Sequence, residues 1–251
     1  MKERRIVASI QARMNSSRLP GKVMKMVVDK PLLQHQIERV KRSKLLDGIV
    51  IATSQAKDND VIEKLGRKLN VDVFRGSEDD VLGRLVGAIK SFNIDVHVEL
   101  HGDCPFTDPE IIDEFIRFFL EHEYDYISND LKTTYPPGLE VAVYDAEKLV
   151  EAESQIGDAL IREHGSLCIK NHPDKYKLYN INAPAELHYP DVYIELDTEE
   201  DFMVTKTLYE TFYPVDPEFT SLDIIRFMND HPELTETNAN VERRWKEYRQ
   251  D

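Results

Sequence analysis

Three basic side chains gather in a polar segment near the start of the chain. Arg13, Arg18 and Lys22 fall within ten residues of one another, with Ser16 and a second serine between them. Arginine contributes forked donors and lysine a point charge, while hydroxyl and backbone N–H groups complete a cradle for a multiply charged anion. Residues 11–22, which we name the first loop, therefore predict a polyphosphate site, although an ordinary solvated basic loop shares this composition.

Two acidic positions could hold a divalent metal beside that anion. Asp103 follows the alternating apolar run DVHVEL, and a carboxylate at the end of a strand can bind Mg²⁺ over phosphates. Glu195 and Asp197 are two residues apart in an expected strand, so their side chains would share one face. Each position also has a plainer interpretation, because an Asp after Gly102 forms turns and acids around Thr198 cap helices.

Other familiar chemistries find no support in the sequence. It contains no GxxxxGK[ST], GxGxxG or GxSxG motif, which argues against a P-loop ATPase, a standard dinucleotide site and a serine hydrolase. His164, Cys168 and His172 recur at helical spacing. A helix separates residues eight apart by ~12 Å, which is too far for one zinc ion. We interpret these three residues as one face of a helix.

The first half of the chain alternates short apolar runs with helical patterns. This rhythm predicts parallel βαβ units in an α/β fold. Ligands of such sheets bind at the carboxyl ends of the strands, where the first loop and residues 101–108 would lie. The predicted strands are residues 4–10, 48–53, 71–74 and 95–100, and the predicted helices are residues 32–44, 58–70, 79–92 and 109–120.

The rhythm changes in the second half of the chain. Residues 124–144 are strand-like around a Pro-Pro-Gly break, which favours an antiparallel excursion or a lobe over the sheet edge. Without a repeat or a linker, the chain is predicted to be one domain, 1–251, with an inserted lobe at about 124–182. The remaining predicted helices are residues 145–155, 158–171, 199–211, 221–230 and 240–249, and the remaining strands are residues 177–182 and 192–196.

Composition narrows the class of protein. The 251 residues are 41% apolar and 31% charged, which is enough for one core and a charged surface. A total of 47 acidic against 32 basic side chains gives a net charge of −15, which disfavours binding to nucleic-acid backbones or anionic membranes. Two cysteines, no secretory signal and no run of 18 apolar residues predict a reduced, cytoplasmic protein.

Several segments together resemble the CMP-sugar synthetases. The runs SIQARMNSSRLPGKVM, FRGSEDDVLGR, GDCPFTDP, IREH and ELDTEEDF follow one another in order along the chain. They are similar to the acylneuraminate and 3-deoxy-manno-octulosonate cytidylyltransferases, and the QARM wording is most similar to the SpsF-type branch, typified by a spore coat polysaccharide biosynthesis protein. The resemblance implies a three-layer, Rossmann-like nucleotide-diphospho-sugar-transferase fold with a mainly parallel mixed sheet and a small antiparallel lobe. It also implies Mg²⁺-dependent transfer of CMP from CTP to an acidic sugar, with release of pyrophosphate.

The same resemblance implies roles for individual residues. Arg13, Lys22 and Asp103 would be catalytic, with the two cations stabilising the departing pyrophosphate. Asp103, Asp197 and Glu195 would hold Mg²⁺. Nucleotide binding is implied for Ala12, Arg13, Ser16, Arg18, Lys22, Ser77, Asp80, Arg84 and His101, and acceptor binding for Gly138, Glu140, Arg162 and His164.

The sequence leaves the acceptor open. The leading hypothesis is a nonulosonate-like 2-keto-3-deoxy sugar acid used in surface polysaccharide or glycan synthesis. The alternatives are a cytidylyltransferase that acts on a phosphate or phosphonate, and a sugar-nucleotide-dependent glycosyltransferase of the same fold. Relatives pair through the inserted lobe, so a homodimer is expected, with the stretch from Tyr124 to Tyr144 as a candidate surface.

Overall fold

A seven-stranded sheet forms the centre of the computed structural model, which describes residues 4–247. Four neighbouring strands of this sheet run parallel, as the sequence pattern predicted. In the first strand, Ile6 and Ala8 enter one apolar core while Val7 enters the other, because successive side chains point to opposite faces. The parallel strands are β1 (Ile6–Gln11), β4 (Gly48–Ser54), β5 (Asp72–Gly76) and β6 (Val96–His101).

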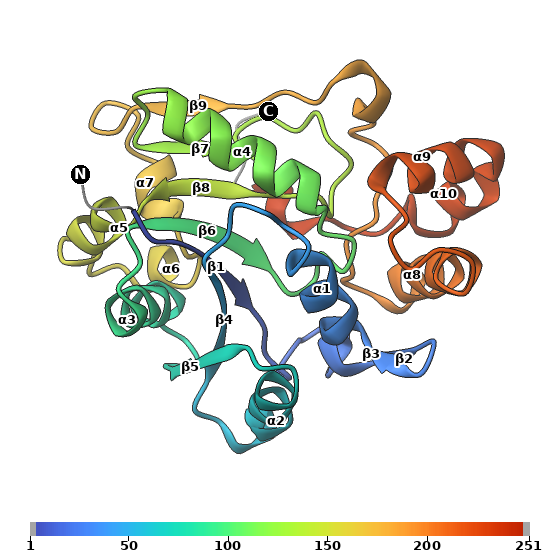
Figure 1. Cartoon of the computed structure of the whole chain (residues 1–251), viewed down its shortest axis with the longest axis horizontal. Coiled ribbons are helices and arrows are strands. Elements are labelled where there is room, and N and C mark those ends of the chain that lie inside the picture. Colours follow the sequence, from blue (N-terminus) through green and yellow to red (C-terminus); the bar gives the residue numbers. More distant parts are fainter. Residues whose placement is uncertain (1–3, 248–251) are drawn as a thin grey trace.

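Helices cover both faces of the sheet and give three layers (Figure 1). Three of them supply apolar side chains to the core that contains Ile6, and a fourth packs into the core that contains Val7. The α/β expectation is therefore confirmed. The first group is α1 (Leu32–Val40), α2 (Asp60–Lys68) and α4 (Pro109–Glu121), and the fourth helix is α3 (Val81–Phe92).

The sheet becomes mixed in the segment 124–182. β8 pairs antiparallel with β6 and β7, and β7 pairs parallel with β9. The antiparallel pairing expected here is present, but these strands extend the central sheet, because β8 pairs with the otherwise open edge of β6 and β7 and β9 follow beyond it. A separate two-stranded antiparallel sheet lies earlier in the chain. The segment contains β7 (Tyr126–Ser128), β8 (Ala142–Asp145), β9 (Leu178–Asn180), α5 (Ala146–Glu153), α6 (Ala159–Arg162) and α7 (Leu167–Lys170), and the small sheet is β2 (Met26–Val27) with β3 (Lys30–Pro31).

The helix expected over 158–171 is interrupted at Gly165. This residue adopts a left-handed φ of 53°, and a Cβ at its position would lie 2.5 Å from Oε1 of Glu99. Only glycine combines that backbone conformation with so close an approach. The prediction of one continuous helix was therefore wrong, because apolar spacing does not report a tertiary contact with β6.

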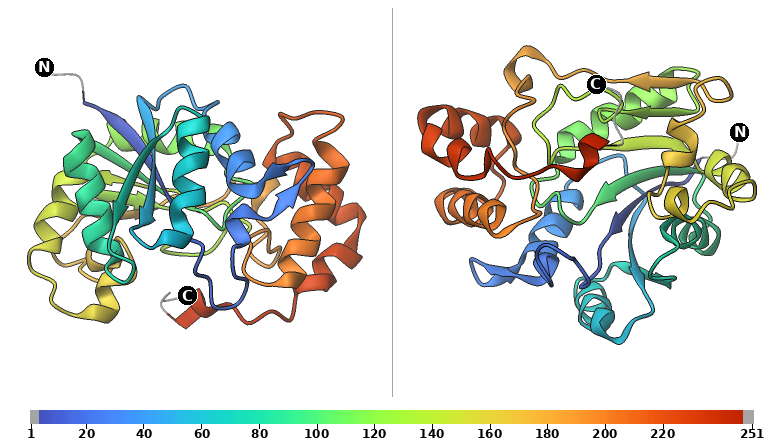
Figure 2. Two further views of the ribbon diagram at one scale, coloured as in Figure 1. Left: turned by 90° about the horizontal axis from the view of Figure 1, so that it is seen from below. Right: turned by 180° about the vertical axis from the view of Figure 1, so that it is seen from behind.

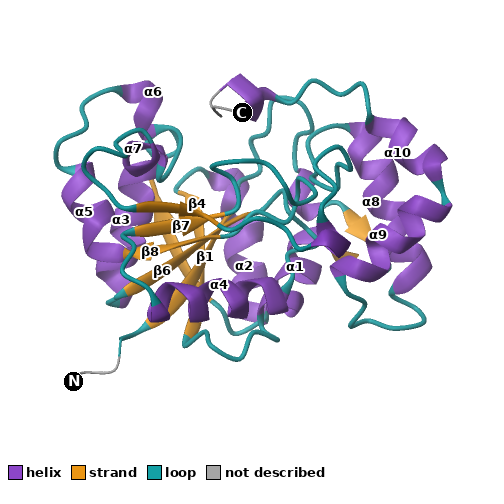
Figure 3. Ribbon diagram, turned by 90° about the horizontal axis from the view of Figure 1, so that it is seen from above, coloured by secondary structure: helices purple, strands orange, loops and turns teal. Residues whose placement is uncertain are grey.

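The remaining helices form a group beside the carboxyl ends of β1 and β6 (Figures 1 and 3). They are α8 (Glu199–Phe212), α9 (Ser221–Asp230) and α10 (Pro232–Asn238), of which α10 was not predicted. No described helix is both long and apolar enough to cross a membrane.

Two further expectations near the C-terminus were wrong. The strand expected over 192–196 does not join the sheet, because its N–H groups donate to loop carbonyls: Ile194 to Pro137, and Leu196 to Asp103, each at 2.8 Å. The helix expected over 240–249 is, within the described residues, only a short 3-10 helix, Arg244–Glu247. Other 3-10 helices are Lys22–Met24, Lys57–Asn59 and Ala185–Leu187.

Candidate active site

The first loop folds back on itself at the carboxyl end of β1. The N–H of Gly21 donates to the carbonyl of Met14 at 2.8 Å, and Gly21 adopts a φ of 69°, which glycine does without strain. The N–H of Met14 in turn donates to Oδ1 of Asn59 at 2.8 Å. This closed loop buries Lys22 and directs its side chain toward the end of β6.

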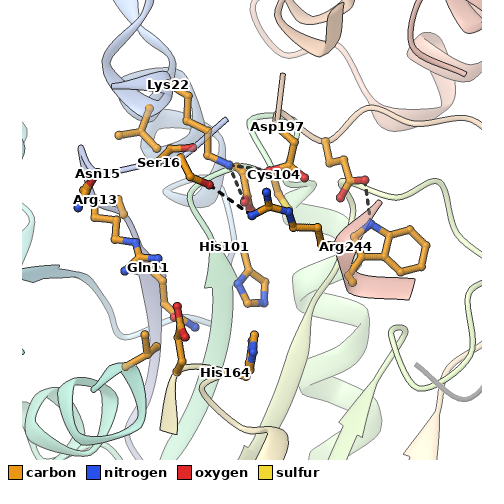
Figure 4. A pocket seen from close by; sticks show the side chains of 18 of the residues that line it. Gln11, Arg13, Asn15, Ser16, Lys22, His101, Cys104, His164, Asp197 and Arg244 are labelled. Carbon is orange, nitrogen blue, oxygen red and sulfur yellow. Dashed lines mark hydrogen bonds and ion pairs between the residues drawn. The ribbon is translucent and has the colours of Figure 1, made fainter. Parts of the chain in front are cut away.

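Lys22 lies between two carboxylates that are far apart in the sequence. Its Nζ donates to Oδ2 of Asp103 and to Oδ1 of Asp197, each at 2.9 Å (Figure 4). Nη2 of Arg18 lies 2.6 Å from the other oxygen of Asp197. The structure thus brings together four of the residues that the sequence singled out, as two cations facing two acids.

Lys22 and Asp103 hold each other in their charged forms. Burial alone would raise the pKa of Asp103, but the charge and hydrogen bond of Lys22 hold that pKa at about 2. Burial alone would lower the pKa of Lys22, and the charges of Asp103 and Asp197 raise it instead. At neutral pH the cavity therefore presents a carboxylate and an ammonium in direct contact.

Backbone contacts set the positions of the two aspartates. The N–H of Leu196 donates to the carbonyl of Asp103. The N–H of Asp197 donates to Oδ2 of Asp201 at 3.0 Å, and Asp201 forms a reciprocal capping box with Thr198 at the start of α8. The aspartate pair is therefore held by the backbone as well as by the lysine.

Glu195 does not join this pair. Its Oε1 accepts a hydrogen bond from Nε1 of Trp245 at 2.8 Å and lies 3.3 Å from Nη1 of Arg243. Burial, and then the charge of Glu140, raise the pKa of Glu195 to about 8. Within residues 4–247, no three His, Cys, Asp or Glu side chains gather so that they could hold a metal ion. The three-carboxylate set implied by the sequence is thus reduced to two aspartates that share one cation.

A cavity of about 660 Å³ opens beside this cluster. Figure 4 shows Lys22 and Asp197 at one end of it, with His101 and His164 further along. Most of the predicted site residues line the cavity. They come from the first loop, α3, the end of β6 and the loop after it, the segment before β8, the turn between α6 and α7, and the segment before α8. These lining residues are Ala12, Arg13, Ser16, Arg18, Lys22, Arg84, His101, Asp103, Glu140, His164, Glu195 and Asp197.

Four predicted binding residues are absent from the lining. Asp80 caps α3 through Gly83, and Ser77 accepts a hydrogen bond from the N–H of Asp80 at 3.1 Å. Nη2 of Arg162 pairs at 2.6 Å with Asp80 and with an acid on α5. Gly138 has a φ of 112°, and a Cβ there would lie 2.5 Å from a backbone nitrogen of the segment before Asp197. The structure places these four residues where they brace the walls of the cavity.

Two arginines form the wall beside α3. Nη1 of Arg13 lies 3.6 Å from Oε1 of Glu78. Arg84 is only 3% exposed and donates to the carbonyl of Ser77 at 2.6 Å. Burial, and then the charge of Arg13, lower the pKa of Arg84. Glu78 and Asp79 line the same part of the cavity, so the two guanidinium groups supply donors for an anion beside two acids.

The sequence did not predict several other lining residues, which belong to two separate parts of the cavity. Opposite the first loop, Nζ of Lys170 donates to Oδ2 of Asp130 at 2.8 Å. Beside the first loop, Arg244 and Trp245 of the C-terminal segment line the cavity, and Arg244 contacts Ser17. Trp245 is the only tryptophan of an acidic chain and follows two arginines, a signal that could have identified this segment. No comparable signal marks Lys170 or Asp130.

A cysteine also lines the cavity, but it is poorly suited to covalent chemistry. Cys104 is 3% exposed. Burial, and then the charge of Glu140, raise the pKa of its thiol well above the ordinary value. The thiolate is the reactive form of cysteine. The arrangement therefore favours binding and electrostatic stabilisation of an anion over nucleophilic catalysis by this thiol.

Several known proteins are similar to this chain in sequence and in fold. Residues 7–220 match the family described as Cytidylyltransferase. The spore coat polysaccharide biosynthesis protein SpsF of Bacillus subtilis (strain 168) is 35% identical over 242 residues, covering 93% of this chain and 98% of that protein. A 3-deoxy-manno-octulosonate cytidylyltransferase of Pelobacter propionicus is 33% identical over 116 residues, 46% of this chain and 45% of that protein. The solved structure of a cytidylyltransferase from Leptospira borgpetersenii matches with a TM-score of 0.89 at 29% identity, covering 96% of this chain and 100% of the other.

Proposed function

This chain belongs to the cytidylyltransferase family, and from that premise we propose that it transfers CMP from CTP to an acidic sugar and releases pyrophosphate. The observation that carries the proposal is the position of Lys22 between Asp103 and Asp197. Cations and acids that are paired with one another in the free protein can exchange partners when a metal-bound triphosphate arrives. The family makes this protein a nucleotidyltransferase, which leaves the glycosyltransferase alternative without support.

The triphosphate would bind against the first loop. Arg13, Arg18 and Lys22 line that end of the cavity, and their combined charge opposes the repulsion that a net charge of −15 exerts on CTP. During transfer, negative charge grows on the departing pyrophosphate. Lys22 and Arg13 would stabilise that charge, as donors fixed in place before the reaction begins.

Mg²⁺ fits the two aspartates. Oδ2 of Asp103 and Oδ1 of Asp197 converge on a single cation, the ammonium of Lys22. Carboxylate oxygens are hard ligands, and Mg²⁺ is commonly held by one or two carboxylates together with substrate phosphates. When bound, the ion would neutralise phosphate charge and polarise the phosphorus under attack. Lys22, released from the aspartates, would then bind phosphate oxygens.

The acceptor would approach from the wall opposite the first loop. Its hydroxyl oxygen attacks the α-phosphorus, the bond from that phosphorus to the pyrophosphate oxygen breaks, and the hydroxyl proton passes to water. This wall combines Lys170 and His164 with the acids Glu140, Glu163 and Asp130. Three acids repel a phosphate or phosphonate dianion more than a monoanionic sugar with many hydroxyls. This balance supports a 2-keto-3-deoxy sugar acid as the acceptor, and the name of the SpsF relative supports polysaccharide synthesis as its destination.

Two measurements in sequence test this function. A thermal-shift screen of ATP, GTP, UTP and CTP with Mg²⁺ is expected to show the largest stabilisation with CTP. Pyrophosphate release from CTP is then expected only when a 2-keto-3-deoxy sugar acid is added. Preference for another nucleotide, or release with phosphonate acceptors but with no sugar acid, would refute the assignment.

The stretch from Tyr124 to Tyr144 does not offer the dimer surface that the sequence suggested, because Tyr126, Tyr135 and Tyr144 are buried within the protomer. The proposed homodimer would instead form through the outer strand of the segment 124–182. β9 lies at the edge of the sheet, and Tyr179 on this strand is 39% exposed and stacks near Phe118 and Tyr124. An aromatic cluster beside an open strand edge is a suitable contact surface. Light scattering after gel filtration should give twice the mass of the chain, and a Tyr179→Glu variant should run as the monomer.

A further inference from the structure

A buried ion pair anchors the C-terminal segment, residues 238–246, beside the cavity. Two guanidinium nitrogens of Arg243 donate to the two oxygens of Asp201 at 2.8 and 3.0 Å. Asn238 donates to the same carboxylate at 2.8 Å, and Arg243 lies over the ring of Tyr193 at 4.4 Å. The side chains of the pair are 1% and 0% exposed. A buried bidentate pair with these neighbours holds the backbone that leads into Arg244 in one place.

Two reciprocal hydrogen bonds join this segment to the first loop. Nη1 of Arg18 donates to the carbonyl oxygen of Glu242 at 2.9 Å, and Nη1 of Arg244 donates to Oγ of Ser17 at 3.3 Å. Figure 2 shows the C-terminal segment in red beside the blue first loop. Figure 4 shows Arg244 extending into the cavity. The segment thus forms one border of the site at which the triphosphate would bind.

Arg244 differs from the cations of the first loop. Arg13, Arg18 and Lys22 each lie within 4.0 Å of a carboxylate oxygen. Across the described part of the chain, no ion pair involves Arg244, and this residue is exposed. Its guanidinium group donates to a neutral hydroxyl, that of Ser17. Arg244 can therefore bind an incoming anion without first breaking an ion pair.

We propose that Arg244 binds the pyrophosphate portion of the nucleotide, as a further phosphate ligand supplied by the C-terminal segment. The inference rests on the proposed function and adds a residue from outside the part of the chain that matches the family, which ends at residue 220. A guanidinium group fits phosphate oxygens with paired donors. Its contact with Ser17 places it at the end of the cavity occupied by Lys22 and Asp197, away from the wall assigned to the acceptor.

Isothermal titration of the full chain in MgCl2 tests this role, with inorganic pyrophosphate, CTP and CMP as probes. The Arg244→Gln variant is expected to weaken the binding of pyrophosphate and of CTP by about tenfold or more, because it removes charged hydrogen bonds. CMP lacks the two outer phosphates, so its affinity should change by less than about threefold. Arg244→Lys should recover part of the loss.

Two further variants make the result specific. Arg226→Gln removes the same charge from an exposed position on α9 and should leave all three affinities at the wild-type level. Arg243→Met releases the anchor and should weaken pyrophosphate binding although Arg244 is intact. Wild-type pyrophosphate affinity in Arg244→Gln, or an equal loss for CMP, would overturn the inference. A wild-type protein that binds pyrophosphate through Arg244 but prefers another nucleotide would overturn only the choice of CTP.

Discussion

The backbone N–H of Leu196 donates a 2.8 Å hydrogen bond to the carbonyl oxygen of Asp103. This bond joins the loop after β6 to the segment before α8. Asp197 directly follows Leu196, so the bond sets the spacing of the two carboxylates independently of any ligand. Groups that are fixed before the reaction avoid the cost of reorganising during it.

Replacing Lys22 should increase the affinity of Asp103 and Asp197 for Mg²⁺. In Lys22→Met, Asp103 and Asp197 lose the ammonium that competes with Mg²⁺ for their oxygens. Millimolar Mg²⁺ without nucleotide should then raise the melting temperature by about 5 °C, and should raise that of the wild-type protein less. Nucleotidyl transfer should fall at least about a hundredfold, because the lysine can no longer stabilise the leaving group. An identical response of both proteins to Mg²⁺ would argue against a shared cation position.

Gly138, which packs against the segment that carries Asp197, should not tolerate a side chain. Gly138→Ala forces a Cβ to within 2.5 Å of a backbone nitrogen at a φ of 112°. We expect a loss of about 2 kcal/mol in the free energy of unfolding and reduced activity, since the displaced segment carries Asp197. Urea unfolding measures the loss. Gly157→Ala is a matched control, because a Cβ there meets nothing within 4 Å.

A buried histidine should make stability depend on pH. The hydroxyl of Tyr144 donates to Oε2 of Glu99 at 2.8 Å, so its oxygen accepts from Nδ1 of His97 at 2.7 Å. The other ring nitrogen then accepts from the hydroxyl of Ser9 at 2.7 Å. Burial lowers the pKa of His97 to about 4 from its ordinary 6.5. Between about pH 6.5 and pH 4, His97 therefore binds a proton in the unfolded chain but stays neutral in the folded protein.

The contribution of neutral His97 to the free energy of unfolding is therefore fully present above pH 6.5, and it declines as the pH falls toward 4. Between pH 7.5 and 5.5, His97 should account for a loss of about 1 kcal/mol in the free energy of unfolding. His97→Gln should remove that part of the dependence, which urea unfolding at the two pH values would show. Equal pH dependence in the variant and the wild-type protein would contradict the cause assigned here.

Arg162 should contribute to stability and not to acceptor binding. Its guanidinium pairs with Asp80 and Glu153 outside the lining of the cavity. Arg162→Gln should therefore cost about 1 kcal/mol of stability, as a partly exposed ion pair does, and leave the KM for the acceptor within about threefold. His164→Gln, at a residue that lines the cavity, should raise that KM more. A larger rise in Arg162→Gln would restore the acceptor-binding role implied by the sequence.

The sequence predicted those features that depend on local chemistry. Apolar periodicity located the parallel strands and the helices between them. The charge and spacing of Arg18 and Lys22, together with the position of Asp103 after a strand, located the site. Ends of parallel strands meet at one edge of a sheet, so this part of the geometry follows from topology.

The features that the sequence did not predict depend on long-range contacts. Strand alternation grouped Glu195 with Asp197. In the structure, Trp245 and Arg243 bind the carboxylate of Glu195, and both lie about fifty residues further along the chain, where no local pattern links them to it. Residues 192–196 looked like a strand because they are apolar and extended, yet their hydrogen bonds go to loops. The hydrogen bond from Arg244 to Ser17 joins the C-terminal segment to the first loop, and a contact between residues so far apart in the sequence leaves no local pattern.

The fixed aspartate pair is proposed to support the transfer of CMP from CTP to a sugar acid. The most direct measurement follows label from CTP radioactive at the α-phosphate into a CMP-sugar, in the wild-type protein and in Asp103→Asn, with Mg²⁺ and a 2-keto-3-deoxy sugar acid. We predict labelled CMP-sugar and equimolar pyrophosphate from the wild-type protein, and a rate at least about a hundredfold lower from the variant. A wild-type rate in Asp103→Asn, or no labelled product from the wild-type protein with any such acid, would refute the role of the aspartate pair or the assigned reaction, respectively.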